Sequence, residues 1–115
     1  MRAAIIALLL TIASQAEADC DKLCDRDWWK TATAADVQAE LGAGAEVTAR
    51  DQYGSTPLHE AAGNGSAKGI QALLDAGADP KVKDGLNKEP WLYAQFNKRL
   101  KYVEDYWPLL IRSIN

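Results

Sequence analysis

The sequence predicts an all-α protein, a solenoid of about three helix-turn-helix repeats stacked side by side. A motif recurs with a spacing of 33 residues, so that Asp51 and Pro57 correspond to Asp84 and Pro90. A fixed period of this size is typical of stacked-repeat proteins. Within each copy, apolar residues at helical spacing alternate with capping residues and glycines. Hydrophobic residues make up 48% of the 115 residues, which is enough for the core of one domain.

Residues 1–18 have the pattern of a secretory signal peptide. Arg2 supplies a positive charge, residues 3–12 are apolar, and the segment ends in a small-residue cleavage pattern at Ala18. The apolar run of about ten residues is shorter than the roughly 20 residues that span a bilayer. We therefore expect cleavage after Ala18 and a periplasmic or secreted protein without membrane association. An uncleaved N-terminal anchor is the alternative.

The two cysteines of the chain, Cys20 and Cys24, follow the predicted cleavage site. In an oxidising compartment they are expected to form a disulfide. Side chains four apart on a regular helix have Cβ atoms about 5–6 Å apart, whereas a disulfide needs about 3.5–4.5 Å. The bridge therefore requires a turn or an irregular helix start. Two free thiols remain an alternative, and a redox-active pair would have the spacing Cys-x-x-Cys.

The first repeat, residues 19–50, departs from the central one at two aromatic positions. Trp28 and Trp29 stand where the central repeat has Ala61 and Ala62. Since a first repeat has no neighbour on its outer side, we expect the indoles to cover apolar surface there. An aromatic ligand-binding patch is the alternative.

The second helix of this repeat has its own boundary signals. Thr33 is a predicted N-cap, with Asp36 placed three residues later at the positive end of the helix. Val37 and Leu41 form an i, i+4 apolar stripe. The glycines of residues 42–44 are expected to end this helix, because glycine adopts the left-handed conformation without a steric penalty.

The complete repeat spans residues 51–83. Gly54 allows a tight turn, and Thr56-Pro57 is a helix start in which proline occupies the first helical position. Residues 63–65 break this helix, Ser66 caps the next one, and a glycine ends it. The predicted buried stripe of that second helix comprises Ile70, Leu73 and Leu74.

The third repeat, residues 84–115, is degenerate. Asn87 replaces the turn glycine and tolerates the same left-handed geometry, while Glu89 replaces the capping threonine. Pro108 is expected to kink or delay the terminal helix. Four residues of that helix are predicted to share one face, namely Tyr106, Trp107, Leu110 and Ile114.

One complete motif resembles an ankyrin repeat. It reads Asp51-x-x-Gly54-x-Thr56-Pro57-Leu58-His59-x-Ala61-Ala62-x-x-Gly65, followed by Leu73-Leu74-x-x-Gly77-Ala78-Asp79. Degenerate copies on both sides extend the resemblance over nearly all of the chain after the signal. The segment Leu100-Lys101…Tyr106-Trp107-x-Leu109 also resembles the closing helix of some small exported bacterial ankyrin proteins.

The resemblance implies an architecture and a role for the single histidine. In the family, helix pairs stack on neighbouring repeats and the turns project as short β-hairpin fingers. The histidine at the position of His59 hydrogen-bonds locally and ties its helix to the turn. The expected units are therefore the signal peptide, an N-terminal capping repeat (19–50), a complete repeat (51–83) and a C-terminal capping repeat with its terminal helix (84–115).

No catalytic or cofactor site is predicted. His59 is the one histidine, so a Ser-His-Asp set and a histidine-rich metal site both lack members. No glycine-rich phosphate loop is present. The formal net charge is -3, with an excess of acids in residues 19–79 and of bases in residues 80–115, and this balance argues against nucleic-acid binding. We expect no enzyme activity, no cofactor and no metal.

The predicted function is a non-enzymatic protein-protein interaction module of the cell envelope. Its partner would bind to the hairpin tips and the concave helix face, with Tyr53 and Leu86 as anchors. The candidate binding residues are those with no expected structural role: Arg50, Gln52, Tyr53, Ser55, Gly63, Asn64, Lys83, Gly85, Leu86 and Lys88.

Two other functions remain open. An inhibitor or immunity-type protein that blocks an exported enzyme or toxin would use the same surface. A purely structural protein would self-associate through Trp28, Trp29 or the Tyr106-Trp107 pair. We expect a monomer, and the sequence leaves open which partner it binds and whether binding inhibits or scaffolds.

Overall fold

The computed structural model describes residues 20–101 and 103–114, and within the last helix it leaves the side chains of residues 103, 106, 107, 113 and 114 undescribed. The signal peptide predicted for residues 1–18 lies outside this part of the chain. The elements are η1 (Asp21–Cys24), α2 (Arg26–Trp29), α3 (Ala34–Gly42), α4 (Pro57–Asn64), α5 (Ala67–Asp75), α6 (Pro90–Ala94) and α7 (Val103–Ile114).

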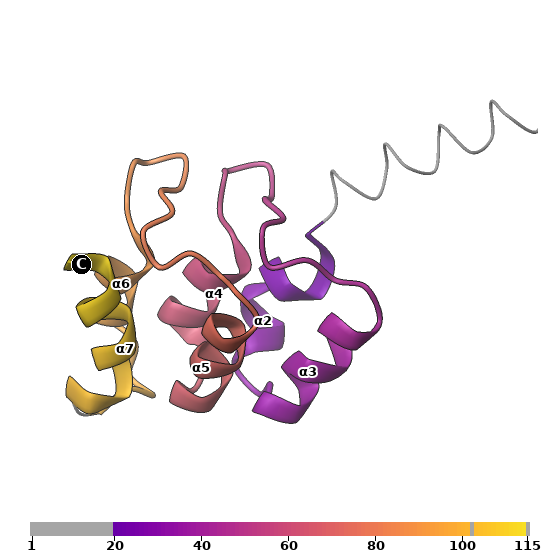
Figure 1. Ribbon diagram of the computed structural model, residues 1–115, viewed down its shortest axis with the longest axis horizontal. Helices are drawn as coiled ribbons and strands as arrows, with labels where there is room; N and C mark the ends of the chain where they lie inside the picture. Colours follow the sequence, from indigo (N-terminus) through magenta and orange to yellow (C-terminus); the bar gives the residue numbers. More distant parts are fainter. Residues whose placement is uncertain (1–19, 102, 115) are drawn as a thin grey trace, which may run out of the picture.

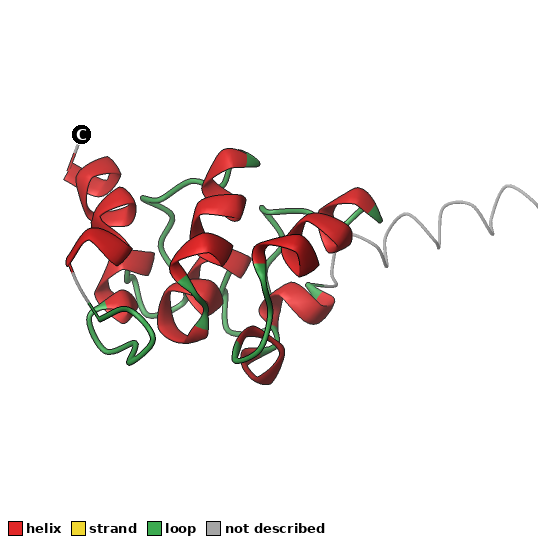
Figure 2. Cartoon of the chain, turned by 90° about the horizontal axis from the view of Figure 1, so that it is seen from below, coloured by secondary structure: helices red, strands yellow, loops and turns green. Residues whose placement is uncertain are grey.

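The helices stack as three pairs in two layers. Helices α2, α4 and α6 lie side by side in one layer, and α3, α5 and α7 form the other (Figures 1 and 2). Contacts between α4 and α5 and between α6 and α7 join the layers. The described part of the chain is thus all-helical, as predicted. None of the described helices combines the length and the apolarity needed to cross a bilayer.

Two loops project from the stack on the same side (Figure 1). We call residues 43–56 the first finger and residues 76–89 the second finger. The expectation of β-hairpins is wrong, because no residue in the described ranges is in a strand. Each finger is instead closed by a backbone hydrogen bond across a turn, from Asp51 to Ser55 and from Asp84 to Lys88, both 3.0 Å long.

The predicted boundary signals act as expected. Thr33 Oγ1 accepts from the N–H of Asp36, whose carboxylate accepts from the Thr33 N–H, so the two residues form a capping box. The finger turns need left-handed backbone at Gly54 (φ 76°) and Asn87 (φ 63°). Asparagine is among the few side chains that accept this conformation, so the replacement in the third repeat preserves the turn.

Cys20 and Cys24 form a disulfide, as predicted, with their Cα atoms 5.4 Å apart. The residues between them form the short 3-10 helix η1, and Asp21 has a positive φ of 48°. This is the irregular helix start that the geometry of the bridge requires.

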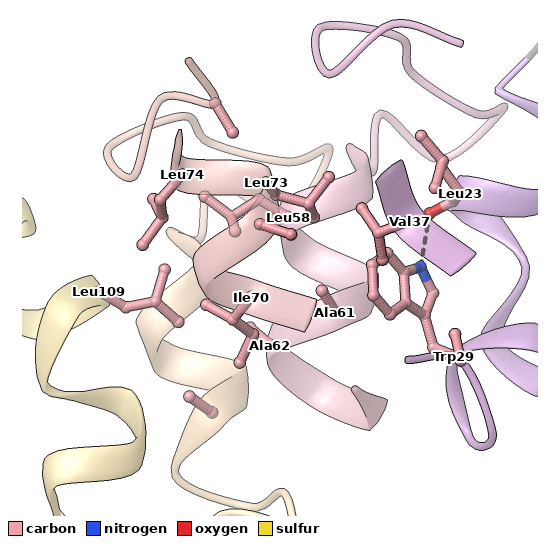
Figure 3. Packing of buried hydrophobic residues seen from close by; sticks show 14 of the residues in the cluster. Leu23, Trp29, Val37, Leu58, Ala61, Ala62, Ile70, Leu73, Leu74 and Leu109 are labelled. Atoms are coloured by element: carbon pink, nitrogen blue, oxygen red, sulfur yellow. Dashed lines mark hydrogen bonds between the residues drawn. The ribbon is translucent and has the colours of Figure 1, made fainter. Parts of the chain in front are cut away.

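Trp29 faces the inside of the stack, which corrects the expectation that both indoles cover the outer side of the first repeat. Its side chain is fully buried, and its Nε1–H donates to the Leu23 carbonyl at 2.7 Å (Figure 3). The second repeat makes room for the ring, because a Cβ at Gly65 or Gly69 would lie 2.9 or 3.1 Å from indole carbons. Trp29 therefore fills the boundary between two repeats.

The terminal helix also differs from the prediction. Helix α7 begins at Val103, before Pro108, so the proline does not delay it. Leu109 is the fully buried residue, whereas Leu110 is only half-buried. The predicted face therefore missed Leu109. The side chains of Tyr106, Trp107 and Ile114, which were assigned to that face, lie outside the described residues.

Candidate partner-binding face

The two fingers are held together by polar contacts. Arg50 Nη1 donates to the carbonyls of Gly54, at 2.9 Å, and Lys83, at 2.8 Å, and so links one finger to the next. The Gly85 N–H donates to the Tyr53 carbonyl at 3.0 Å. A Cβ at Gly85 would collide with that carbonyl oxygen. Arg50 and Gly85 therefore have structural roles, which corrects the expectation that they are free for recognition.

His59 fixes the second finger to the helix layer. The Thr56 N–H donates to Nδ1 at 3.3 Å, and Nε2 lies 2.7 Å from the Lys88 carbonyl. Because a carbonyl can only accept, Nε2 carries the proton and Nδ1 is the acceptor. The role implied by the ankyrin resemblance is thus confirmed, and the contact reaches the turn of the following repeat.

Asp84 organises the tip of the second finger. Its Oδ1 accepts from the N–H groups of Leu86 and Lys88, and its Oδ2 accepts from the Tyr93 hydroxyl. Burial alone would raise the pKa of Asp84, but these three hydrogen bonds outweigh it and lower the pKa below its ordinary value of 3.8. Burial and the hydrogen bond to Asp84 raise the pKa of Tyr93 to about 12.

These shifts predict an acid-sensitive finger. Since the pKa of Asp84 is lower in the folded state, its stabilisation is present above the ordinary value of 3.8 and is lost as the pH falls through the lowered pKa. We expect the free energy of unfolding, measured by urea titration at a series of acidic pH values, to fall more steeply for the wild type than for Asp84→Asn. Tyr93→Phe should show an intermediate slope, because the Asp84 pKa then moves back toward its ordinary value. Parallel curves for all three proteins would contradict this role of Asp84.

Beneath the fingers lies an open groove of about 410 Å³. Its walls carry Tyr53, Leu86 and Phe96, which are the large hydrophobic side chains most exposed in the described chain, at 72%, 72% and 82%. Tyr53 and Leu86 also line a second hollow between the finger tips. Exposed apolar side chains gathered in one concavity are typical of an interaction site.

Some of the other predicted residues are available for binding and some are not. Asn64 and Gly63 line the groove and are half-buried, and Gln52 is exposed beside Tyr53. Ser55 is only 8% exposed, and its hydroxyl donates to Glu60 at 2.9 Å. The assumption that Ser55 has no structural role is therefore wrong.

Lys83 and Lys88 lie on the second finger with exposed side chains, but neither lines the groove. Within the described residues their backbone groups, rather than their ammonium groups, make hydrogen bonds.

Seven residues that line the groove were not among the predicted binding residues, namely Arg26, Asp51, His59, Glu60, Asp84, Tyr93 and Phe96. Phe96 had a readable signal, since it is an aromatic residue in the polar link that follows Ala94. Glu60 and Tyr93 occupy the same position of successive repeats. The sequence pattern does not distinguish this position from other helix surface, and only the structure shows that it lines the groove. Within the described residues, no group of three or more His, Cys, Asp or Glu side chains is arranged to hold a metal ion.

Comparison with protein families gives one match. Residues 39–89 match the family model described as ankyrin repeats (many copies). No curated protein matches the chain significantly. The matched segment contains the end of α3 (residues 39–42), both fingers, α4 and α5. Residues 39–89 are therefore similar to ankyrin repeats, and the stacked helix pairs agree with this similarity.

Proposed function

We propose that the chain is a non-enzymatic protein-binding module of the cell envelope, which holds its partner in the groove beneath the fingers. Ankyrin repeats generally mediate protein-protein interaction. The observation that carries the proposal for this chain is the gathering of Tyr53, Leu86 and Phe96, each more than 70% exposed, on one groove. Such side chains bury much apolar area on binding at little entropic cost.

A location outside the cytoplasm is supported by two observations. Residues 1–18 have the pattern of a signal peptide, and the Cys20–Cys24 disulfide is of a kind that persists in oxidising compartments. We propose a periplasmic or secreted monomer whose partner is a protein of the same compartment.

The binding face gives a direct mutational test. Tyr53→Ala, Leu86→Ala and Phe96→Ala are each expected to weaken partner binding about tenfold, the usual loss for an exposed aromatic or aliphatic anchor of about 1.4 kcal/mol. The partner is identified by crosslinking in intact cells and mass spectrometry, and the affinities are then measured with purified proteins. Far-UV circular dichroism should be unchanged, because none of the three side chains is in the core.

Lys68→Ala is the matched control, since Lys68 is exposed on α5 in the other helix layer. Equal affinities for the wild type and all three groove variants would show that the partner uses another surface.

An inhibitor or immunity-type protein is a second candidate, because a partner enzyme or toxin would occupy the same groove. Addition of the purified chain to a cell-envelope extract separates the two functions. If the wild type abolishes one hydrolytic activity of the extract and the Tyr53→Ala variant leaves that activity intact, inhibition is favoured over scaffolding.

A further inference from the structure

Acidic side chains outnumber basic ones among the residues that line the groove. Three carboxylates line it, from Asp51, Glu60 and Asp84, and Arg26 is the one permanently charged base among the described lining residues. A neighbouring hollow shares Asp51 and adds further acids, while its only base, Arg50, is already bonded to two backbone carbonyls. The groove therefore combines exposed apolar side chains with an excess of negative charge.

The three carboxylates do not have equal partners. Asp84 accepts hydrogen bonds on both oxygens, with Tyr93 donating to Oδ2. One repeat earlier, Asp51 stands in the place of Asp84, and Glu60 stands in the place of Tyr93. The phenol donor of one repeat is thus replaced by a second acceptor in the other.

The carboxylates of Asp51 and Glu60 each use one oxygen in hydrogen bonds to described residues. Oδ1 of Asp51 accepts from the N–H groups of Tyr53 and Ser55, and Oε2 of Glu60 accepts from the Ser55 hydroxyl. The second oxygen of each carboxylate makes no hydrogen bond or ion pair with any residue in the described part of the chain. Because both carboxylates contact Ser55 and both line the groove, one cation of a partner can approach the two together.

We propose that the groove binds a partner polypeptide segment in which a lysine or arginine is flanked by large apolar residues. The cation pairs with Glu60 and Asp51, and the apolar neighbours cover Tyr53, Leu86 and Phe96. An arginine would gain twice, since its planar guanidinium bonds carboxylates and also packs on aromatic rings. The exposed apolar side chains favour a polypeptide over a free small cation, and the excess of negative charge repels nucleic acid. This inference rests on the proposed function and adds the chemistry of the partner.

The test uses random linear peptides displayed on phage and selected on the full wild-type protein. The expected result is enrichment of peptides with Lys or Arg next to Phe, Leu, Trp or Tyr. Enriched peptides should bind Glu60→Gln about fivefold more weakly, the effect of losing one exposed to half-buried ion pair. Their affinity for the wild type should also fall with added salt, and less so for the variant.

Glu46→Gln is the matched control, because it removes the same charge at an exposed position outside the groove. Glutamine can still accept the Ser55 hydroxyl hydrogen, so Glu60→Gln is expected to fold, which circular dichroism checks. Three outcomes overturn the inference. They are no enrichment, enrichment of acidic or uncharged peptides, and basic peptides that bind Glu60→Gln as tightly as they bind Glu46→Gln.

The failure of this inference can be separated from failure of the proposed function. If the enriched peptides lack basic residues but lose affinity on Tyr53→Ala, the groove is a binding site and only the charge argument is wrong. If neither the peptides nor the crosslinked cellular partner depend on Tyr53, Leu86 or Phe96, both proposals are wrong. Self-association of the chain through this groove, seen by sedimentation and abolished by Leu86→Ala, would also overturn the assignment of a separate partner.

Discussion

Replacement of Trp29 by alanine is expected to lower the free energy of unfolding by about 3–5 kcal/mol, the usual range for the loss of a fully buried tryptophan. A small domain has about 5–15 kcal/mol in total, so this single change removes a large share. In a domain of about 100 residues, each 1 kcal/mol shifts the melting temperature by about 4–8 °C. We therefore expect a fall of at least about 12 °C, measured by circular dichroism.

The physical reason is that the start of the first repeat, before α3, contains only very short helices. η1 and α2 have four residues each, far fewer than the roughly 12 that an isolated helix needs for marginal stability. The indole holds these segments by its hydrogen bond to the Leu23 carbonyl and by its contacts with the glycines of the second repeat. Alanine at this position leaves a cavity at the boundary of the two repeats and an unpaired carbonyl.

Two comparisons isolate this role. Trp28→Ala removes an indole whose ring centre is 5.0 Å from that of Trp29 but which is only half-buried, and its effect should be much smaller. Trp29→Phe keeps most of the apolar volume but loses the N–H donor, so it should fall between wild type and alanine. Equal melting temperatures for the Trp28 and Trp29 alanine variants would contradict the packing argument.

The helix starts and the finger turns could be predicted because the residues that form them act locally. Thr33 and Asp36 cap a helix start, and Gly54 and Asn87 permit the left-handed turns, whichever repeat surrounds them. The direction in which Trp29 points is not a local property. The 33-residue register placed it correctly, but its burial depends on the missing side chains of Gly65 and Gly69 in the next repeat.

In the candidate site, too, local features could be predicted and contacts between repeats could not. Tyr53 and Leu86 could be identified because they are apolar residues at the tips of predicted turns, where little else can cover them. The structural roles of Arg50 and Gly85 depend on the neighbouring finger, whose distance no sequence pattern gives. Phe96 stands 33 residues after Gly63, a predicted binding residue, so the register carried a signal for Phe96 that the prediction did not use.

Asn97 is a further example of a residue whose role depends on another repeat. It follows α6, is 5% exposed, and its Nδ2 donates to the carbonyls of Ala62 and Gly65, both at 2.9 Å. These carbonyls belong to the end of α4, where the helix itself supplies no partners. The Asn97 Oδ1 accepts from the N–H of Arg99, and Arg99 Nη1 in turn donates to the carbonyl of Trp29 at 2.7 Å. One buried amide therefore joins the third repeat to the second and positions a contact to the first.

Replacement of Asn97 by alanine is expected to cost about 2–3 kcal/mol, because two buried carbonyls each lose a donor that water cannot replace. Asn97→Asp separates hydrogen bonding from packing. Aspartate keeps the shape and can still accept from Arg99, but at neutral pH it presents a carboxylate oxygen to two carbonyls, so it should be less stable than alanine. In acid the protonated carboxyl regains one donor, and the stability of Asn97→Asp relative to wild type should then improve. Urea unfolding of the three proteins at neutral and acidic pH measures both effects. If Asn97→Asp is as stable at neutral pH as Asn97→Ala, the Asn97 amide does not act as the donor that caps α4.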